Sequence, residues 1–355
     1  MVSELHYLII GFHSELETLM TARIRQLAIG VLVLGLSVGC TDKRTPPPQF
    51  PISINNQDGE ILVATAEVQF NGKTTNAYQM KVQTGSLYLT GTTMGFSRWD
   101  IGTAPYSPSL TFAQHDNIIS FSPAPPFGQW TPQSYGSGAV EINYPYAYVS
   151  GGLGTSVIDL SQTTNPVEVE RYPRPVGNSA PGADVAFIYK GFAKHPTQPG
   201  VIYGFREQDY IYTLAASGAS LSIAKKDAYT QSGATVCCVR GATTFGDKIF
   251  IAFRNALWVL GVNGTALTQP LILSQIHAQA ITSTATLLYV YHEPVAQSGS
   301  TLTAGIYVFD RSGNQVAFLP IRPRSFTVSE DDGYLYANMD GEAVKIFEIK
   351  WSQQF

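Results

Sequence analysis

The segment "KIFIAFRNALWVL" at residues 248–260 decides the fold class of this chain. It holds two runs of β-branched and aromatic residues, 248–253 and 256–260, on either side of a two-residue connection. Residues of these types favour strands, and so short a connection favours an antiparallel hairpin. An Asn-Gly pair follows at 263–264 and predicts a second turn, because both residues tolerate the positive φ of tight turns. The segment therefore predicts consecutive antiparallel strands.

The same two-strand pattern recurs along the chain, which makes it a repeat rather than an isolated hairpin. The first strands are "SLYLTG" (86–91), "YAYVSG" (146–151), "VIYGFR" (201–206), "KIFIAF" (248–253), "LLYVYH" (287–292) and "YLYANM" (334–339). Their partners are "FSRWDI" (96–101), "SVIDL" (156–160), "YIYTL" (210–214), "ALWVL" (256–260), "IYVFD" (306–310) and "VKIFEI" (344–349). Further strands follow most pairs, namely "VEVERY", "LSIAKK", "PLILS" and "VAFLPI". We expect each pair and its neighbouring strands to form one four-stranded unit.

Composition agrees with an all-β chain and argues against a nucleic-acid binder. Hydrophobic residues make up 44% of the 355 residues, which is enough for a sizeable core. Charged residues make up only 14%, and the net charge is −4. No cluster of Lys and Arg follows Arg44, although binding to a phosphate backbone requires such a cluster. We therefore expect no nucleic-acid partner.

Six such units, spaced about 40 to 60 residues apart, resemble the blades of a β-propeller. The segment "SVIDLSQTTNPVEV" is similar to the LVIVD- or WD-like repeats of bacterial surface propellers. The resemblance implies an all-β propeller of four-stranded blades over residues 57–355. Six blades are expected, or seven if residues 113–143 form a degenerate blade. A β-sandwich and two small barrels are the alternatives, although so many hairpins would give a sandwich too many strands.

The two ends of the repeat region complement each other. The last hairpin stops almost at the C-terminus and has no outer strand after it, whereas "EILVATAEVQF" (60–70) precedes the first unit as a spare strand. Pairing of these segments would complete the last blade, close the ring and remove an exposed sheet edge.

The N-terminal region carries an export pattern. Arg23 and Arg25 precede an apolar run at 27–38, which is too short to span a bilayer, and small residues then lead to Cys40. This pattern resembles a bacterial lipoprotein signal, which implies cleavage before Cys40 and acylation of its thiol. By the same resemblance, Thr41 favours the outer membrane. An ordinary secretory signal with an unrelated cysteine is the alternative.

Four regions follow from these patterns. Residues 1–19 are acidic where a signal should be basic, so we interpret them as a mis-annotated upstream segment. Residues 20–39 are the predicted signal peptide, residues 40–56 a proline-rich tether, and residues 57–355 the propeller.

Long insertions suggest which propeller face binds a partner. In a four-stranded blade, the connection from the second to the third strand and the connection from the fourth strand to the next blade lie on the same face. We expect all the long insertions on that face, namely 113–143, 173–184 and 293–304. Long loops on a regular scaffold often carry function, and aromatic and arginine side chains often dominate interfaces. The candidate partner-binding residues are Trp130, Tyr135, Arg206, Glu207, Arg254 and His292. A surface or turn role is the alternative for each.

No motif for catalysis, phosphate binding or metal binding occurs, and the histidines after Cys40 lack metal-ligand spacing. We therefore predict no catalytic residue, metal or cofactor. Adjacent Cys237 and Cys238 could form a strained vicinal disulfide, a feature that resembles quinone-dependent propeller dehydrogenases. The favoured interpretation is two thiols on an inner strand, "TVCCVRG" (235–241). The Glu330, Asp331 and Asp332 carboxylates are interpreted as a β-turn rather than a calcium site.

The sequence thus predicts a non-catalytic propeller that is anchored to the membrane through Cys40 and binds a protein or glycan partner. The alternative is an envelope propeller enzyme, either a quinone-dependent oxidoreductase or a glycan-processing enzyme.

Overall fold

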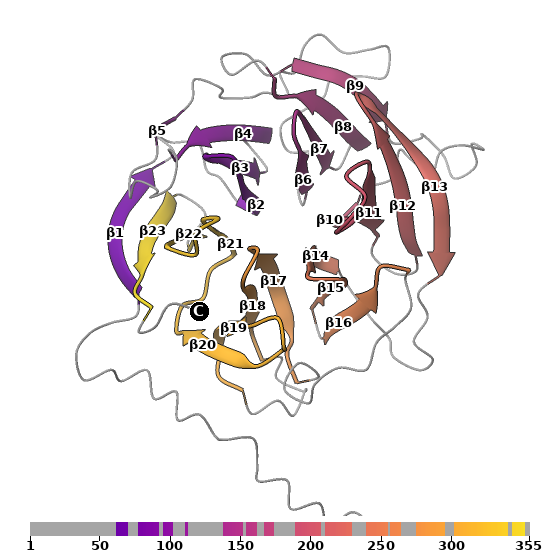
Figure 1. Cartoon of the computed structure of the whole chain (residues 1–355). Coiled ribbons are helices and arrows are strands. Elements are labelled where there is room, and N and C mark those ends of the chain that lie inside the picture. The colour runs from indigo at the N-terminus through magenta and orange to yellow at the C-terminus, as the bar shows by residue number, and fades with distance from the viewer. Residues whose placement is uncertain are drawn as a thin grey trace, which may run out of the picture. The chain divides into compact units, whose positions relative to one another are not determined.

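The computed structural model describes residues 62–69, 77–91, 95–101, 111–112, 138–151, 154–161, 167–173, 189–206, 210–228, 239–254, 256–263, 275–294, 302–339 and 343–351. All of these lie in one compact unit, Ile52–Phe355. Every regular element in these ranges is a strand (Figure 1). No helix there has the length and apolar character that a membrane crossing requires. The prediction of an all-β fold is therefore confirmed for this part of the chain.

The described residues form six antiparallel sheets, and neighbouring strands in each of the following series pair with each other. The first sheet is β2 (Ala77–Gln83), β3 (Ser86–Gly91), β4 (Gly95–Asp100) and β5 (Thr111–Phe112); the second is β6 (Ala139–Asn143), β7 (Tyr146–Gly151), β8 (Gly154–Asp159) and β9 (Val167–Pro173). The third is β10 (Gly191–Lys194), β11 (Val201–Phe205), β12 (Tyr210–Ser217) and β13 (Ser220–Ala228). The fourth, with three strands described, is β14 (Val239–Phe245), β15 (Lys248–Phe253) and β16 (Ala256–Gly261).

The last two sheets contain the remaining strands. The fifth is β17 (Ala278–Ser283), β18 (Leu288–His292), β19 (Gly305–Phe309) and β20 (Gln315–Leu319). The sixth is β21 (Ser325–Val328), β22 (Tyr334–Asn338), β23 (Ala343–Ile349) and β1 (Leu62–Gln69). Here β1 pairs with β23, so the predicted spare strand does join the last hairpin.

All six predicted hairpins are present. They are β3–β4, β7–β8, β11–β12, β15–β16, β18–β19 and β22–β23, and each is antiparallel. The predicted strand at 270–274 lies outside the described residues. Of the inner strand expected at 235–241, residues 239–241 belong to β14, and residues 235–238 are also outside the described ranges.

The first strands of the sheets, called the inner strands below, contact one another in cyclic order. The sequence of contacts is β2, β6, β10, β14, β17, β21 and back to β2. Figure 1 shows these strands facing a common centre, with the outer strands farthest from it. Residues that are far apart in sequence therefore meet along the inner strands.

Each second strand has a buried aromatic residue at an equivalent position, which gives a common reference point for comparing the six sheets. These residues are Tyr88, Tyr148, Tyr203, Phe250, Tyr289 and Tyr336, all at most 5% exposed. In β3 and β18 every residue is buried, on both faces of the strand. Such continuous burial is expected of a sheet that is packed between two neighbouring sheets. The core therefore lies between adjacent sheets rather than beneath one of them.

Three inner strands carry a β-bulge at the same place. The pairing register shifts between Ala77 and Gln79 in β2, between Val239 and Gly241 in β14, and between Ala278 and Ala280 in β17. A bulge bends its strand and redirects the following side chains. These bulges precede the part of the inner strands where the cavity described below lies.

Two expectations about connections need correction. Residues 139–143 are inner strand β6 of the second sheet, so they are not part of an additional blade, and residues 113–137 lie outside the described residues. Residues 102–110 separate third strand β4 from fourth strand β5, and the strand ends that flank them lie at the face opposite those that flank the predicted insertions. Strand β5 has only two residues. A strand this short shows no alternation of polar and apolar residues, so the sequence after β4 does not reveal where the connection ends and the strand begins.

Candidate functional site

One face collects the longest connections, and we call it the loop-rich face. It is the face where second strands lead to third strands and outer strands lead to the next inner strand. Because strands alternate in direction, the strand ends that flank residues 113–137, 174–188, 229–238 and 295–301 all lie there. The turns at the opposite face include the two-residue turn Thr84-Gly85, whose φ angles of 52° and 70° fit a type I′ hairpin.

Two of the predicted partner-binding residues lie at the loop-rich face. Arg206 follows β11 and is half-buried, and its Nη1 donates to the Tyr212 hydroxyl at 3.1 Å. Its guanidinium carbon also lies 6.0 Å from the centroid of the Tyr212 ring. Arg254 follows β15 and is exposed. Arg206 is therefore held against its own sheet, whereas Arg254 is available at the surface.

His292 ends β18 near the same face, but its side chain is fully buried. The backbone N–H of His277 donates to His292 Nδ1 at 2.8 Å, and the two rings lie 5.6 Å apart. The Tyr307 ring packs edge-on against His292 at 5.8 Å. Burial, followed by the neighbouring His277, lowers the pKa of His292, and burial lowers that of His277. The expectation that His292 presents its side chain to a partner does not fit this placement, because the packing of β17 to β19 covers it.

The remaining predicted residues, Cys40, Trp130, Tyr135, Glu207, Cys237 and Cys238, lie outside the described residues. Their roles stay predictions.

A second candidate region lies along the inner strands. The buried aromatic residues of the second strands define equivalent positions in the six sheets. Each inner strand has a residue that pairs with the residue two places after this aromatic residue. These six equivalent residues are Gln79, Ala139, Gly191, Gly241, Ala280 and Ser325. Five of these residues are small, and only Gln79 has a long side chain. Gly241 is part of this pattern, because a Cβ there would lie 3.7 Å from Gln79 Nε2. The small residues leave room for Gln79 to extend past its neighbours.

Gln79 connects four inner-strand segments. Its Nε2 donates to the carbonyl oxygen of Lys190 at 2.7 Å and to that of Arg240 at 3.3 Å. Its Oε1 accepts from the Val140 backbone N–H at 3.3 Å. One side chain therefore satisfies backbone groups of the second, third and fourth sheets from a position in the first sheet.

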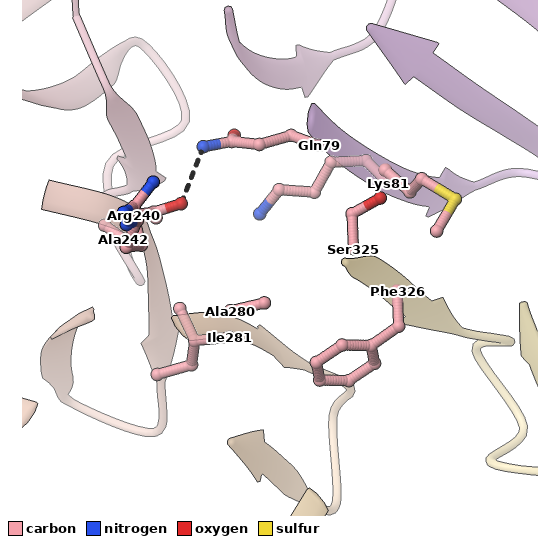
Figure 2. A pocket seen from close by; sticks show the side chains of 10 residues that line it. Gln79, Lys81, Arg240, Ala242, Ala280, Ile281, Ser325 and Phe326 are labelled. Carbon is pink, nitrogen blue, oxygen red and sulfur yellow. Dashed lines mark hydrogen bonds between the residues drawn. The ribbon is translucent and has the colours of Figure 1, made fainter. Parts of the chain in front are cut away.

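Beside Gln79 the inner strands β2, β14, β17 and β21 line a small cavity of about 20 Å³ that is partly open to solvent. We call it the inner-strand cavity. Its polar side chains include Gln79, Lys81 and Arg240, and Ile281 and Phe326 are among its apolar ones. Figure 2 shows the Lys81 side chain extending from β2 toward the middle of this space. A volume of this size holds about one water molecule and is far below the roughly 300–1,000 Å³ of small-molecule sites.

Lys81 shares one carboxylate with a second lysine. Its Nζ lies 3.5 Å from Glu141 Oε2, and the Lys194 Nζ lies 3.9 Å from Glu141 Oε1. Lys194 also donates to Gln83 Oε1 at 2.8 Å. Burial lowers the pKa of Lys194, and the charge of Glu141 opposes that shift. Two ammonium groups and one buried carboxylate therefore gather beside the inner-strand cavity.

The acidic turn at the opposite face is structural. Asp331 Oδ1 accepts from the Ser329 hydroxyl at 2.5 Å and from the Gly333 N–H at 3.0 Å. Asp332 is 8% exposed with φ of 60°, and it accepts from the Tyr289 hydroxyl at 2.8 Å and from that of Thr286. Among the described residues no group of His, Cys, Asp and Glu could hold a metal ion. These contacts agree with the predicted β-turn.

Sequence reasoning did not select the residues of the inner-strand cavity. The segment "AYQMKVQ" (77–83) does alternate polar and apolar residues, with Gln79, Lys81 and Gln83 on one side. That period of two marks a strand with one polar face. It does not reveal that Lys81 meets Glu141 and Lys194, because each residue comes from a different sheet.

The comparisons with known proteins bear on the fold. The WD40 domain of Neurospora crassa Pan2 has a similar solved structure, with a TM-score of 0.51 and 9% sequence identity; the match covers 83% of this chain and 97% of that domain. Identity this low shows a shared fold alone. No protein-family model and no curated protein matches the chain. The chain therefore has a WD40-like β-propeller fold, which confirms the predicted all-β propeller architecture.

Proposed function

We propose that this chain is a lipid-anchored, non-catalytic β-propeller of the cell envelope that binds a protein or glycan partner through its loop-rich face. The observation that carries the proposal is the concentration of long connections. The strand ends flanking four of the longest ones lie on that face. A rigid scaffold with variable loops at one face is suited to recognition, since the scaffold fixes the loop ends and the loops supply the contacts.

Six blades in a closed ring form part of this proposal. Six sheets in the described residues and the cyclic contacts of their inner strands support it. The pairing of β1 with β23 supports closure by strands from both ends of the repeat region. Closure would protect the edges of the first and last sheets, which otherwise invite pairing with another chain.

Membrane anchoring rests on the N-terminal sequence. Arg23, Arg25, the apolar run 27–38 and Cys40 follow the order of a lipoprotein signal, and residues 40–56 would tether the propeller to the outer membrane. Labelling cells with a fatty-acid analogue tests this step. Label on the wild type that is lost in Cys40→Ser supports it, and an unlabelled wild type contradicts it.

Partner binding is tested by affinity capture from solubilised envelopes. The wild type is compared with a Trp130→Ala/Tyr135→Ala double variant and with Tyr144→Ala. Tyr144 is a matched aromatic control, because it is 51% exposed at the opposite face, between β6 and β7. We expect the double variant to lose a partner that the wild type and Tyr144→Ala retain. A partner that only Tyr144→Ala loses would place binding at the opposite face.

Glycan binding has a separate arm. The same proteins are tested on an array of envelope glycans, and a glycan retained by the wild type but lost by the double variant would identify the partner class. If neither a protein nor a glycan is retained by the wild type, the proposed function is wrong.

A further inference from the structure

Three exposed arginines lie on the loop-rich face, where strands of the fourth and fifth sheets end. They are Arg240, Arg254 and Arg322, and we call them the arginine patch. Arg240 is the second residue of β14, Arg254 follows β15, and Arg322 follows β20. Because strands alternate in direction, the start of β14 and the ends of β15 and β20 all lie at this face.

The two sheets that carry the arginine patch are in direct contact. Strand β17 contacts both β14 and β15, and Figure 1 shows the two sheets as neighbours. The Nε2 of Gln279 donates to the carbonyl oxygen of Arg254 at 3.0 Å, which joins β17 to the end of β15. Arg240 and Gln279 are the extra residues of the β-bulges in their strands, and a bulge redirects such a side chain. The patch therefore extends across the junction of the two sheets.

Positive charge dominates this surface. At this end of the fourth and fifth sheets, Glu293 is the one acidic residue that the structure describes, and its Oε2 accepts from the Tyr291 hydroxyl at 3.0 Å. Burial and this hydrogen bond raise the pKa of Tyr291, and the charge of Arg322 opposes them, so Arg322 lies near the same hydroxyl. The neighbouring connections contain no charged residue in their sequence; they are 229–238, 264–274 and 295–301. Three cations therefore accompany one carboxylate.

The excess of positive charge is local. At the opposite end of the same two sheets, Asp247 precedes Lys248 and Asp310 precedes Arg311, so positive and negative charges balance there. The chain as a whole carries a net charge of −4. Since a surface with charges of one sign attracts ligands of the opposite sign, the arginine patch favours an anionic ligand.

The residue types of the patch indicate which anion suits it. A guanidinium group stays protonated and presents a planar set of donors that matches the two oxygens of a carboxylate. The exposed large hydrophobic side chains of the described residues all lie in the second sheet and its turns, at Tyr144, Val167 and Val169. The core of a protein–protein interface is usually apolar and poor in charge. A polar chain with carboxylates spaced along it therefore fits the patch better than a folded protein does.

We propose that the arginine patch binds an acidic polysaccharide through the carboxylates of its uronic acid units. This inference rests on the proposed function, since both assign binding to the loop-rich face, and it selects a glycan as the partner. The exposed polar side chains of Gln275 and Thr303, at the same end of the fifth sheet, suit the hydroxyl groups of such a chain. An acidic protein segment carries the same carboxylates, so the experiment includes one.

Biolayer interferometry of the full chain on three immobilised polymers tests the proposal. The polymers are polygalacturonate, its methyl ester and poly-glutamate. The methyl ester has the same sugar backbone without the charge, and poly-glutamate has the charge without the sugar. We expect the wild type to bind polygalacturonate most tightly. Binding to the methyl ester should be about tenfold weaker or more, because the ester cannot form charge-assisted hydrogen bonds.

Two double variants separate the patch from the overall charge of the chain. Arg254→Gln/Arg322→Gln removes two cations of the patch, and the Gln279 bond remains because it uses the backbone of Arg254. Arg311→Gln/Lys350→Gln removes two exposed cations at the opposite face. We expect the first variant to bind polygalacturonate about tenfold more weakly or worse, and the second to bind it as the wild type does.

The variants also define the results that contradict the proposal. Glu293→Gln removes the competing carboxylate and should tighten binding severalfold, so weaker binding would count against the patch. Equal weakening by the two double variants would overturn the proposal, as would equal binding of the wild type to polygalacturonate and its methyl ester. Tighter binding to poly-glutamate would refute the choice of a glycan and indicate an acidic protein segment. If Arg254→Gln/Arg322→Gln fails to fold, Arg240→Gln replaces it with the same expectation.

Capture from solubilised envelopes distinguishes failure of this inference from failure of the proposed function. A partner that the wild type and Arg254→Gln/Arg322→Gln retain equally would leave the proposed function intact and overturn the role of the arginine patch alone. If the wild type retains no envelope protein or glycan, both fail.

Discussion

The Nε2 atom of Gln79 lies 2.7 Å from the carbonyl oxygen of Lys190, although 111 positions separate the two residues. This contact links the first sheet to the segment that enters the third, and the same amide group reaches Arg240 and Val140. A single side chain thus fixes the spacing of inner strands that share no sheet.

Gln79→Ala should lower the free energy of unfolding by about 1–3 kcal/mol, because it removes three hydrogen bonds and leaves inner-strand backbone groups without them. Urea denaturation followed by circular dichroism measures the effect. Gln279→Ala is the control, because Gln279 makes one exposed bond, to the Arg254 carbonyl oxygen at 3.0 Å. Equal losses in the two variants would show that the contacts of Gln79 are not special.

Gly191→Ala should destabilise the propeller through overpacking. A Cβ at Gly191 would lie 2.9 Å from the Ala242 backbone nitrogen and from the Gly241 carbonyl carbon, which cannot move independently of β14. We expect a loss of about 1–3 kcal/mol in unfolding free energy. Gly200→Ala is the matched control, since its Cβ would meet the Ala216 carbonyl oxygen at an acceptable 3.4 Å. A neutral Gly191→Ala would mean that β10 can move away from β14.

The buried pair His277 and His292 should make stability depend on pH. Burial lowers both pKa values below the 6.5 of an unfolded histidine, so the unfolded state binds protons first. The stability contribution is therefore complete above pH 6.5 and is lost as pH falls through the lowered folded pKa values. Denaturant midpoints measured from pH 7.5 to 5 should fall more steeply for the wild type than for His292→Asn. Asn cannot titrate but retains an acceptor for the His277 N–H. Parallel curves would exclude His292 as a source of the pH dependence.

Asp332→Ala should cost about 2–4 kcal/mol, because it leaves the buried Tyr289 hydroxyl without its acceptor and places alanine at a positive φ. Asp332→Asn keeps an oxygen acceptor, and asparagine tolerates this backbone conformation, so most of the stability should remain. Thermal unfolding of both variants distinguishes the two outcomes. Similar losses in Asn and Ala would assign the effect to the carboxylate charge instead.

Sequence periodicity predicted the hairpins well because their determinants are local. Tyr88 and Phe250 each lie in the middle of a short run of strand-forming residues, and short connections link these runs to their partners. The inner strands were harder to predict, since bulges in β2, β14 and β17 interrupt the period of two.

The candidate sites were predicted less completely. Arg254 is exposed as expected, but the burial of His292 depends on packing against Tyr307, which a linear pattern does not encode. The grouping of Lys81, Glu141 and Lys194 depends on the order of the sheets in space. If the same sheets were arranged in a different order in space, Lys81 would lie on a polar strand face without Glu141 and Lys194 beside it.

The pairing of Gln69 with Ala343 has a consequence for synthesis of the protein. Strand β1 leaves the ribosome, and crosses any export channel, long before β23 exists. It must therefore wait for its partner while the other five sheets are made, and its hydrogen-bonding edge must stay unpaired or protected during that time. A chaperone that binds extended segments would protect β1 during this interval. In a chain that lacks β23, strand β1 would never find its partner and its edge would stay unpaired.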